Sequence, residues 1–172
     1  MRTLNTKEIS DCVYRLARKA GVTLTPACHA ALGSAAAQET GAARFALETV
    51  LENERTAARE QMPVCQDTGM AVVLIDLGQD VRLSGAPLKE AVDDGVRRAY
   101  ADGCFRKSIC DPLTRENTGD NTPAHLHLDM VAGETVRVTF LPKGFGSENM
   151  SRLVMLTPSQ GRKGIVDTIV ET

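Results

Sequence analysis

The sequence predicts an α/β (or α+β) fold, with an N-terminal helical lobe over residues 1–61 and a mixed β-sheet with flanking helices over residues 62–172. Three observations support this prediction. Apolar residues recur at helical spacing through the first sixty positions. The almost wholly apolar run from Met70 to Leu77 indicates a strand that is buried on both faces. Residues 135–141 alternate between apolar and polar side chains, as strands with one buried face do.

Three helices are expected in the first part of the chain. The first begins with Thr6 as a possible N-cap and ends just before Gly21. The second opens at Thr25-Pro26, a cap followed by proline in the first turn, and extends to about Glu39. The third spans about residues 43–61. It carries an apolar stripe that we expect to pack inside the lobe, and the stripe consists of Leu47, Val50, Leu51 and Ala58.

The second part of the chain alternates between strands and helices. After the run that starts at Met70, residues 84–87 open a helix that Gly103 ends. The polar stretch 106–123 predicts a long loop, and long loops in compact domains are often functional. The later elements expected are strands at 124–131 and 135–141, a glycine-rich turn at 143–147, and helices at 148–155 and 161–171.

Charge and composition exclude several classes of function. The net charge is −2 and the basic residues are scattered, which argues against a nucleic-acid-binding surface. No apolar run approaches the ~18 residues of a membrane helix, and the N-terminus lacks the apolar stretch of a signal peptide. Five cysteines, an odd number, are better explained as thiols or metal ligands than as a disulfide framework. We therefore expect a cytoplasmic protein.

Cys65-Gln66-Asp67 is the first segment that has the chemistry of a functional site. A thiol, a carboxamide and a carboxylate are adjacent in a turn between Pro63 and Gly69, ahead of the predicted buried strand. Turns at strand ends are common places for ligands, and a thiolate suits a soft metal. The residues alone leave open a structural role, with the cysteine as a small buried side chain and the aspartate in a simple turn.

Two further segments suit an anionic ligand. In residues 143–149 the glycines would let the backbone approach a ligand closely, and Lys143 adds a positive charge. Amide groups at the start of the helix expected next would also favour an anion. Arg106 opens the long loop and could bind a carboxylate with two parallel hydrogen bonds. The structural alternatives are a plain glycine turn and a solvated surface arginine.

A zinc site is a weaker alternative. His125 and His127 lie two residues apart on a predicted strand and therefore share a face. Together with Cys104 and Cys110 they would make four zinc-type ligands. Their spacing matches no usual zinc pattern, in which cysteine pairs are separated by two to four residues.

Taken in order, four segments resemble one family. Residues 63–69, Pro-Val-Cys-Gln-Asp-Thr-Gly, resemble the signature of class I iron–sulfur fumarate hydratases and of the alpha subunit of L(+)-tartrate dehydratase. The Arg-Lys-Ser stretch at 106–108, which leads to Asp-Pro at 111–112, is similar to a second family motif. The loop at 117–124 and the glycine-rich segment at 143–149 resemble a third and a fourth. The resemblance is to the N-terminal portion of the family.

The resemblance implies a hydro-lyase acting on a small dicarboxylic acid such as fumarate, L-malate or L-tartrate. Family members hold a [4Fe–4S] cluster by three cysteines and leave one iron open as a Lewis acid toward the substrate. Carried over by position, Cys65 would be a cluster ligand. The substrate-binding residues would be Gln66, Asp67, Arg106, Lys143 and Gly144.

The sequence departs from the family pattern in one large respect. The other two cluster cysteines belong to a later family segment with a Cys-Pro-Pro motif, which is absent here. The family's catalytic base lies on a separate domain or beta subunit. The resemblance therefore implies a truncated chain that has no catalytic residue of its own and associates with a beta subunit or C-terminal domain in a homo- or hetero-oligomer. The alternative is a non-catalytic binding or assembly module with the same fold and no cluster. Phe145 replaces a common glycine, and His125 an expected apolar residue.

Overall fold

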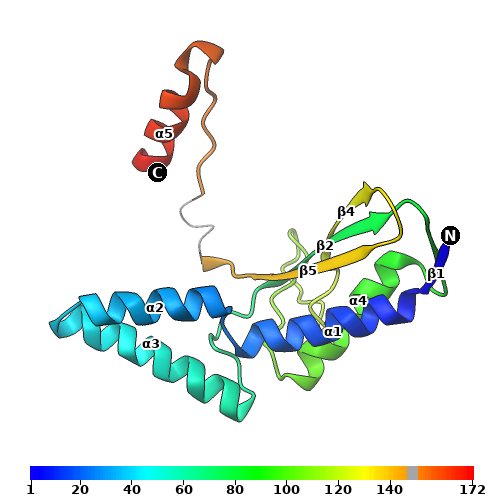
Figure 1. Ribbon diagram of the computed structural model, residues 1–172, viewed down its shortest axis with the longest axis horizontal. Coiled ribbons are helices and arrows are strands. Elements are labelled where there is room, and N and C mark those ends of the chain that lie inside the picture. The colour runs from blue at the N-terminus through cyan, green and yellow to red at the C-terminus, as the bar shows by residue number, and fades with distance from the viewer. Residues whose placement is uncertain (147–150) are drawn as a thin grey trace.

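The computed structural model describes residues 1–146 and 151–172. It contains a three-stranded mixed sheet with two long helices against one face, a hairpin of two further helices at one end, and a C-terminal segment that extends away from this body (Figure 1). The combination of helices with a mixed sheet confirms the predicted α/β class.

The central strand of the sheet is β2 (Met70–Gly78). The strand β4 (His125–Val131) pairs with it in parallel, and β5 (Val136–Lys143) pairs with it antiparallel on the other side. Although only a short turn joins β4 to β5, these two strands do not pair with each other. The antiparallel register places Met70 opposite Lys143. The turn that precedes β2 and the glycine-rich turn that follows β5 are therefore neighbours at one end of the sheet.

A separate parallel pair of short strands lies at the N-terminus, and the sequence did not predict it. It is formed by β1 (Arg2–Asn5) and β3 (Val81–Ser84). Helix α1 (Thr6–Val22) follows β1, and its N-cap is Asn5, not Thr6 as predicted. The Asn5 side chain accepts a hydrogen bond from the Lys7 amide at 2.9 Å. The Thr6 hydroxyl instead donates to the Ala86 carbonyl at 2.9 Å, which ties the helix start to the end of β3.

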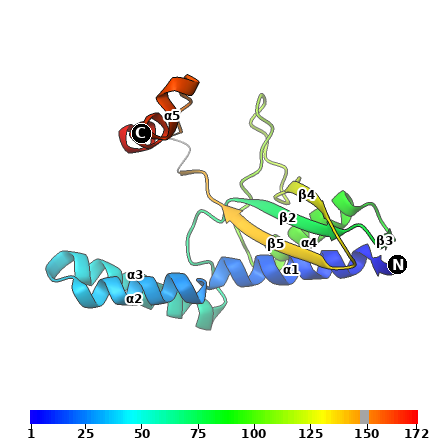
Figure 2. The same cartoon turned by 45° about the horizontal axis from the view of Figure 1, so that its top comes forward.

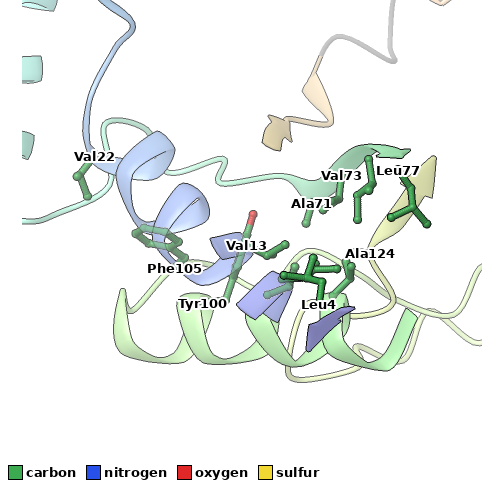
Figure 3. Close-up of a cluster of buried hydrophobic side chains, with 13 residues drawn as sticks. Leu4, Val13, Val22, Ala71, Val73, Leu77, Tyr100, Phe105 and Ala124 are labelled. Atoms are coloured by element: carbon green, nitrogen blue, oxygen red, sulfur yellow. The ribbon is translucent and has the colours of Figure 1, made fainter. Parts of the chain in front are cut away.

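Helix α1 packs along α4 (Leu88–Asp102), and together these helices cover one face of the sheet. The core between them is mainly aliphatic, as a chain with 3% aromatic residues requires. Figure 3 shows the close packing of these side chains. The core includes Val13 from α1, Val92, Val96 and Tyr100 from α4, and Ala71, Val73, Ile75 and Leu77 from β2.

The prediction that β2 is buried on both faces is wrong for the described residues. Its residues alternate strictly along most of the strand, with Ala71, Val73 and Ile75 at 1% exposure or less while the residues between them are only half-buried. Helices α1 and α4 therefore cover one face of β2, although the residues on its other face are also largely apolar.

Helices α2 (Pro26–Gln38) and α3 (Gly41–Glu60) form an antiparallel hairpin beyond the end of α1 (Figure 1). Thr25 caps α2 as predicted, because its hydroxyl accepts from the Cys28 amide at 3.2 Å. The predicted apolar stripe of α3 is only partly packed: Leu51 is buried, whereas Val50 is 46% exposed.

The C-terminal segment matches the prediction in part. The expected helix at 148–155 falls partly on residues 147–150, which lie outside the described residues, and residues 151–157 are not helical. A short 3-10 helix, η2 (Pro158–Gln160), leads into α5 (Gly161–Glu171), which agrees with the predicted closing helix. Among the described elements, α5 packs mainly against η2.

Two expectations concern the chain as a whole. No helix in the part of the chain that the structure describes is both long and apolar enough to cross a membrane. The division at residue 61 into a helical lobe and an α/β part stays a prediction. Within the described residues, α1 packs chiefly against α4 and β5, while α2 and α3 pack chiefly against each other.

Candidate active site

The Cys65-Gln66-Asp67 turn lies just before β2, where the backbone of the glycine-rich turn passes close by. Gly69 has a φ of +63°, in the region that favours glycine. A Cβ atom at this position would lie 2.2 Å from the Lys143 carbonyl oxygen. Glycine is therefore required at position 69 for the two turns to approach each other. At Gly144, a Cβ would lie 2.9 Å from Oδ2 of Asp67, so a larger residue there would displace the end of that side chain.

The Asp67 carboxylate joins the two turns directly. Its Oδ2 accepts a hydrogen bond from the Phe145 amide at 2.8 Å and from the Gly146 amide at 3.4 Å. Its Oδ1 accepts from the Gly69 amide at 3.1 Å. These bonds, led by that from Phe145 and assisted by the charge of Arg106, hold the pKa of Asp67 below its usual value. The amides that the sequence suggested for a ligand carboxylate thus bind the carboxylate of Asp67.

Two buried polar side chains, which the sequence did not single out, bind the backbone of the Cys65-Gln66-Asp67 turn from inside the fold. The Tyr100 hydroxyl on α4 donates to the Thr68 carbonyl at 2.8 Å, and burial raises the pKa of this phenol strongly. The Asn121 side chain is fully buried; its Nδ2 donates to the Gly69 carbonyl at 3.1 Å and its Oδ1 accepts from the Ser108 amide at 2.6 Å. Both residues therefore fix the backbone of the candidate site from within the fold.

The start of the long loop is tied to the same turn. The Thr68 hydroxyl donates to the Arg106 carbonyl at 2.7 Å, and Thr68 itself is buried. Together with the bond from Asn121 to Ser108, this contact places the side chains of residues 106–108 beside the turn. In the sequence, the indication of a functional role for Asn121 was its place in the long polar loop. Tyr100 lies on a buried helical face, and no pattern indicated that it would contact the site.

These segments enclose a cleft of about 770 Å³. Cys65, Gln66, Asp67 and Arg106, all predicted as site residues, line it. Lys143 and Gly144 do not line it, but they directly precede Phe145 in the chain, and Phe145 does line it. The Lys143 Nζ donates to the Gly144 carbonyl at 2.6 Å. The sequence analysis assigned Cys110, which also lines the cleft, only to the zinc alternative. The cleft residues that it assigned to no site are Met70, Lys107, Ser108, Ile109, Arg115, Asn117 and Phe145.

The zinc alternative is wrong. Within residues 1–146 and 151–172, no three histidine, cysteine, aspartate or glutamate side chains come together as a metal site, so Cys104, Cys110, His125 and His127 do not form one. His127 instead lies 3.5 Å from the Asp129 carboxylate. All five cysteines are free thiols, and that of Cys65 is exposed.

The fold and cleft define an α/β protein in which an exposed thiol, a carboxamide and several cationic groups line one cleft. Comparison with known proteins extends this description. The family model described as fumarate hydratase (Fumerase) matches residues 10–172. The chain therefore belongs to the fumarate hydratase family, which includes hydro-lyases named as class I fumarate hydratases and as the tartrate dehydratase alpha subunit.

Individual relatives agree with this assignment. The chain is 35% identical to the putative L(+)-tartrate dehydratase subunit alpha of Methanocaldococcus jannaschii, over 96% of this chain and 60% of that protein. It is 33% identical to the anaerobic class I fumarate hydratase of Escherichia coli K12, over 68% of this chain and 23% of that protein. Fumarate hydratase 2 of Leishmania major is 36% identical over 66% of this chain and 20% of its own length. The chain thus spans only part of the relatives that it matches.

Proposed function

We propose that this chain supplies part of the active site of a hydro-lyase that adds water to, or removes it from, a small dicarboxylic acid. Fumarate with L-malate, or L-tartrate, are the substrates we propose, because the relatives carry these names. The observation that carries the proposal is the cleft that brings Cys65, Gln66 and Arg106 together in a member of this family.

We propose that Cys65 is one ligand of a [4Fe–4S] cluster. Its exposed thiol on the cleft wall fits that role, and the neighbouring Gln66 is uncharged and suited to hydrogen bonding. The described residues offer no complete set of ligands. We propose that two further cysteines, outside these 172 residues, complete it. When bound, such a cluster supplies a Lewis-acidic iron toward the hydroxyl and carboxylate oxygens of the substrate.

The chain's own residues would bind and orient the substrate. Arg106 would hold a carboxylate with charge-assisted hydrogen bonds, and Gln66 would donate to or accept from the substrate hydroxyl. Asp67 is held ionised by the backbone and would present its remaining lone pairs to the substrate from a fixed position. Lys143 and Gly144 would complete the anionic subsite at its edge. The group that transfers the proton at carbon is proposed to lie on a partner.

The proposed partner is a beta subunit or a C-terminal domain within a homo- or hetero-oligomer. The Methanocaldococcus relative is named as an alpha subunit, and this chain spans 60% of it. We also propose a cytoplasmic location, which the five free thiols support because reduced cysteines persist there.

Anaerobic reconstitution of the native assembly with iron and sulfide tests the proposal. Wild type should take up a stoichiometric cluster and dehydrate malate or tartrate. Cys65→Ser should lower activity by more than about 100-fold, since even residues that only support metal ligands contribute 10- to 100-fold. Cys28→Ser, at an exposed thiol on α2, is the matched control and should retain activity.

Two other outcomes would change the conclusion. If the assembly binds no cluster, the alternative of a non-catalytic binding or assembly module replaces the enzyme. If residues 1–172 alone take up a stoichiometric cluster, the proposed division of ligands between this chain and a partner is wrong.

A further inference from the structure

The cleft carries more positive charge than its own carboxylate neutralises. Arg106, Lys107 and Arg115 line it, and Asp67 is the acidic residue among the described lining residues. Asp67 is already engaged by backbone amides of the two turns. A wall with three cations and one committed carboxylate favours a ligand with more than one negative charge.

Arg115 lies in the outer part of the long loop, beyond the Cys110–Asn117 bridge. The loop between α4 and β4 projects from the sheet, as Figure 2 shows. Its far end is closed by backbone hydrogen bonds: the Asp111 amide donates to the Glu116 carbonyl at 2.9 Å, and the Arg115 amide donates to the Asp111 carbonyl at 2.9 Å. The Asp111 side chain also accepts from the Leu113 and Thr114 amides, at 2.8 and 2.7 Å. The backbone that carries Arg115 is therefore well defined.

The two arms of this loop are joined close to the cleft. Cys110 and Asn117 form an isolated antiparallel bridge. The Asn117 side chain donates to the Lys107 carbonyl at 3.0 Å. Because Lys107 follows Arg106 directly, this bond holds Asn117, which lies two residues after Arg115, against the arm that begins at Arg106. Both arginines line one cleft.

The guanidinium of Arg115 is available for a ligand. Arg115 is an exposed residue. Its side chain has no hydrogen-bond or ion-pair partner within residues 1–146 and 151–172. Its φ is +63°, which is uncommon for a residue other than glycine and often marks a functional position.

We propose that Arg115 binds the second carboxylate of the substrate while Arg106 binds the first. This inference rests on the proposed function and deepens it, because it makes Arg115 the residue that selects dicarboxylic over monocarboxylic acids. Two guanidinium groups that line the same cleft match two carboxylates, and each can form a pair of parallel hydrogen bonds.

Calorimetric binding of two four-carbon acids to the native assembly tests this selection. The probes are succinate, which has two carboxylates, and butyrate, which has one. Arg115→Gln should weaken succinate binding by about 10- to 100-fold, the loss expected for a charge-assisted contact, and leave butyrate binding unchanged. Arg115→Lys should fall between, because lysine keeps the charge and loses the planar donor pair. Arg82→Gln, at an exposed arginine on β3, is the control and should match wild type.

The outcomes separate this inference from the proposed function. Equal weakening of both acids by Arg115→Gln, or of neither, would overturn the role of Arg115 and leave the proposed function standing. Failure of the wild-type assembly to bind succinate at all would overturn both.

Discussion

At the scale of single residues, Asp67 illustrates how the site is organised. Its carboxylate accepts from the amides of Phe145, Gly146 and Gly69, and thereby fixes the glycine-rich turn against the turn that carries Cys65. The bonds stabilise the ionised form, and the positive charge of Arg106 adds to them. Asp67 is therefore a structural anion as well as a proposed substrate contact.

Replacement of Asp67 by asparagine should show how much its negative charge contributes to the stability of the fold. Because the folded-state pKa of Asp67 is lowered, its ionisation stabilises the fold above the unfolded-state pKa, about 4, and this contribution is lost as pH falls through the folded-state pKa. Asp67→Asn should therefore lower the urea unfolding midpoint at pH 7, and the difference from wild type should shrink as pH falls below about 4.

Asp80→Asn provides the control, since Asp80 is an exposed aspartate in the turn between β2 and β3. Its difference from wild type should be small throughout. A deficit in Asp67→Asn that stays constant from neutral to acidic pH would show that the charge is not what joins the two turns.

Site residues differed in how far the sequence could predict them. Cys65, Gln66 and Asp67 carry chemistry in adjacent positions, so their grouping in one turn was visible along the chain. Tyr100 and Asn121 act at the site through hydrogen bonds to the backbone of distant residues. The family-like segment 117–124 includes Asn121, but the partners of both side chains are set by tertiary packing and are not visible along the chain.

At the scale of secondary-structure elements, helices α1 and α4 pack closely against each other. Together they cover the sheet, and the candidate site lies at one end of that sheet. A Cβ at Gly95 on α4 would lie 2.5 Å from the Ser10 carbonyl oxygen and 2.9 Å from Cβ of Val13. The helices can approach this closely only with glycine at that point. The contact is reinforced by the Ser10 hydroxyl, which donates to Asp94 at 2.6 Å, and by Arg98, which donates to Ser10 at 2.7 Å.

The same substitution at two helical glycines should have opposite effects. Gly33→Ala on α2 meets no atom within 4 Å and should stabilise the protein by about 0.5–1 kcal/mol, because alanine favours helix. Gly95→Ala should destabilise it by about 1–2 kcal/mol, since the added methyl group forces the two helices apart. Free energies of unfolding from urea titration would measure both, and stabilisation by Gly95→Ala would contradict the close crossing.

Helices were more predictable than strand pairing. Caps and periodicity located α2, α4 and α5 to within a few residues, because those signals are local. The order β4-β2-β5 and the β1–β3 pair join segments far apart in sequence, and no local signal encodes them. The sequence correctly predicted an apolar strand at β2, but it overestimated how far that strand is buried.

At the scale of the whole molecule, several large apolar side chains are exposed where the described chain leaves its compact body. Leu153 is 91% exposed and Met155 is 86% exposed in the non-helical segment 151–157. On α5, Ile169 and Val170 are 70% and 80% exposed. Exposed apolar side chains favour association with a partner when they lie together, and they support the proposed oligomer.

Limited trypsin digestion of the isolated chain should therefore proceed in two stages. An 11-residue helix that packs mainly on a short 3-10 helix is marginally stable on its own. Arg152, in an exposed and non-helical stretch, should be cut first. Arg97 and Arg98, within the packed helix α4, should survive at least about tenfold longer, since their cleavage requires opening of the core. Mass spectrometry of the fragments would record the order. Early cleavage within α4 would show that residues 1–146 do not form a stable core, whereas slower cleavage at Arg152 in the native assembly would place the partner on this segment.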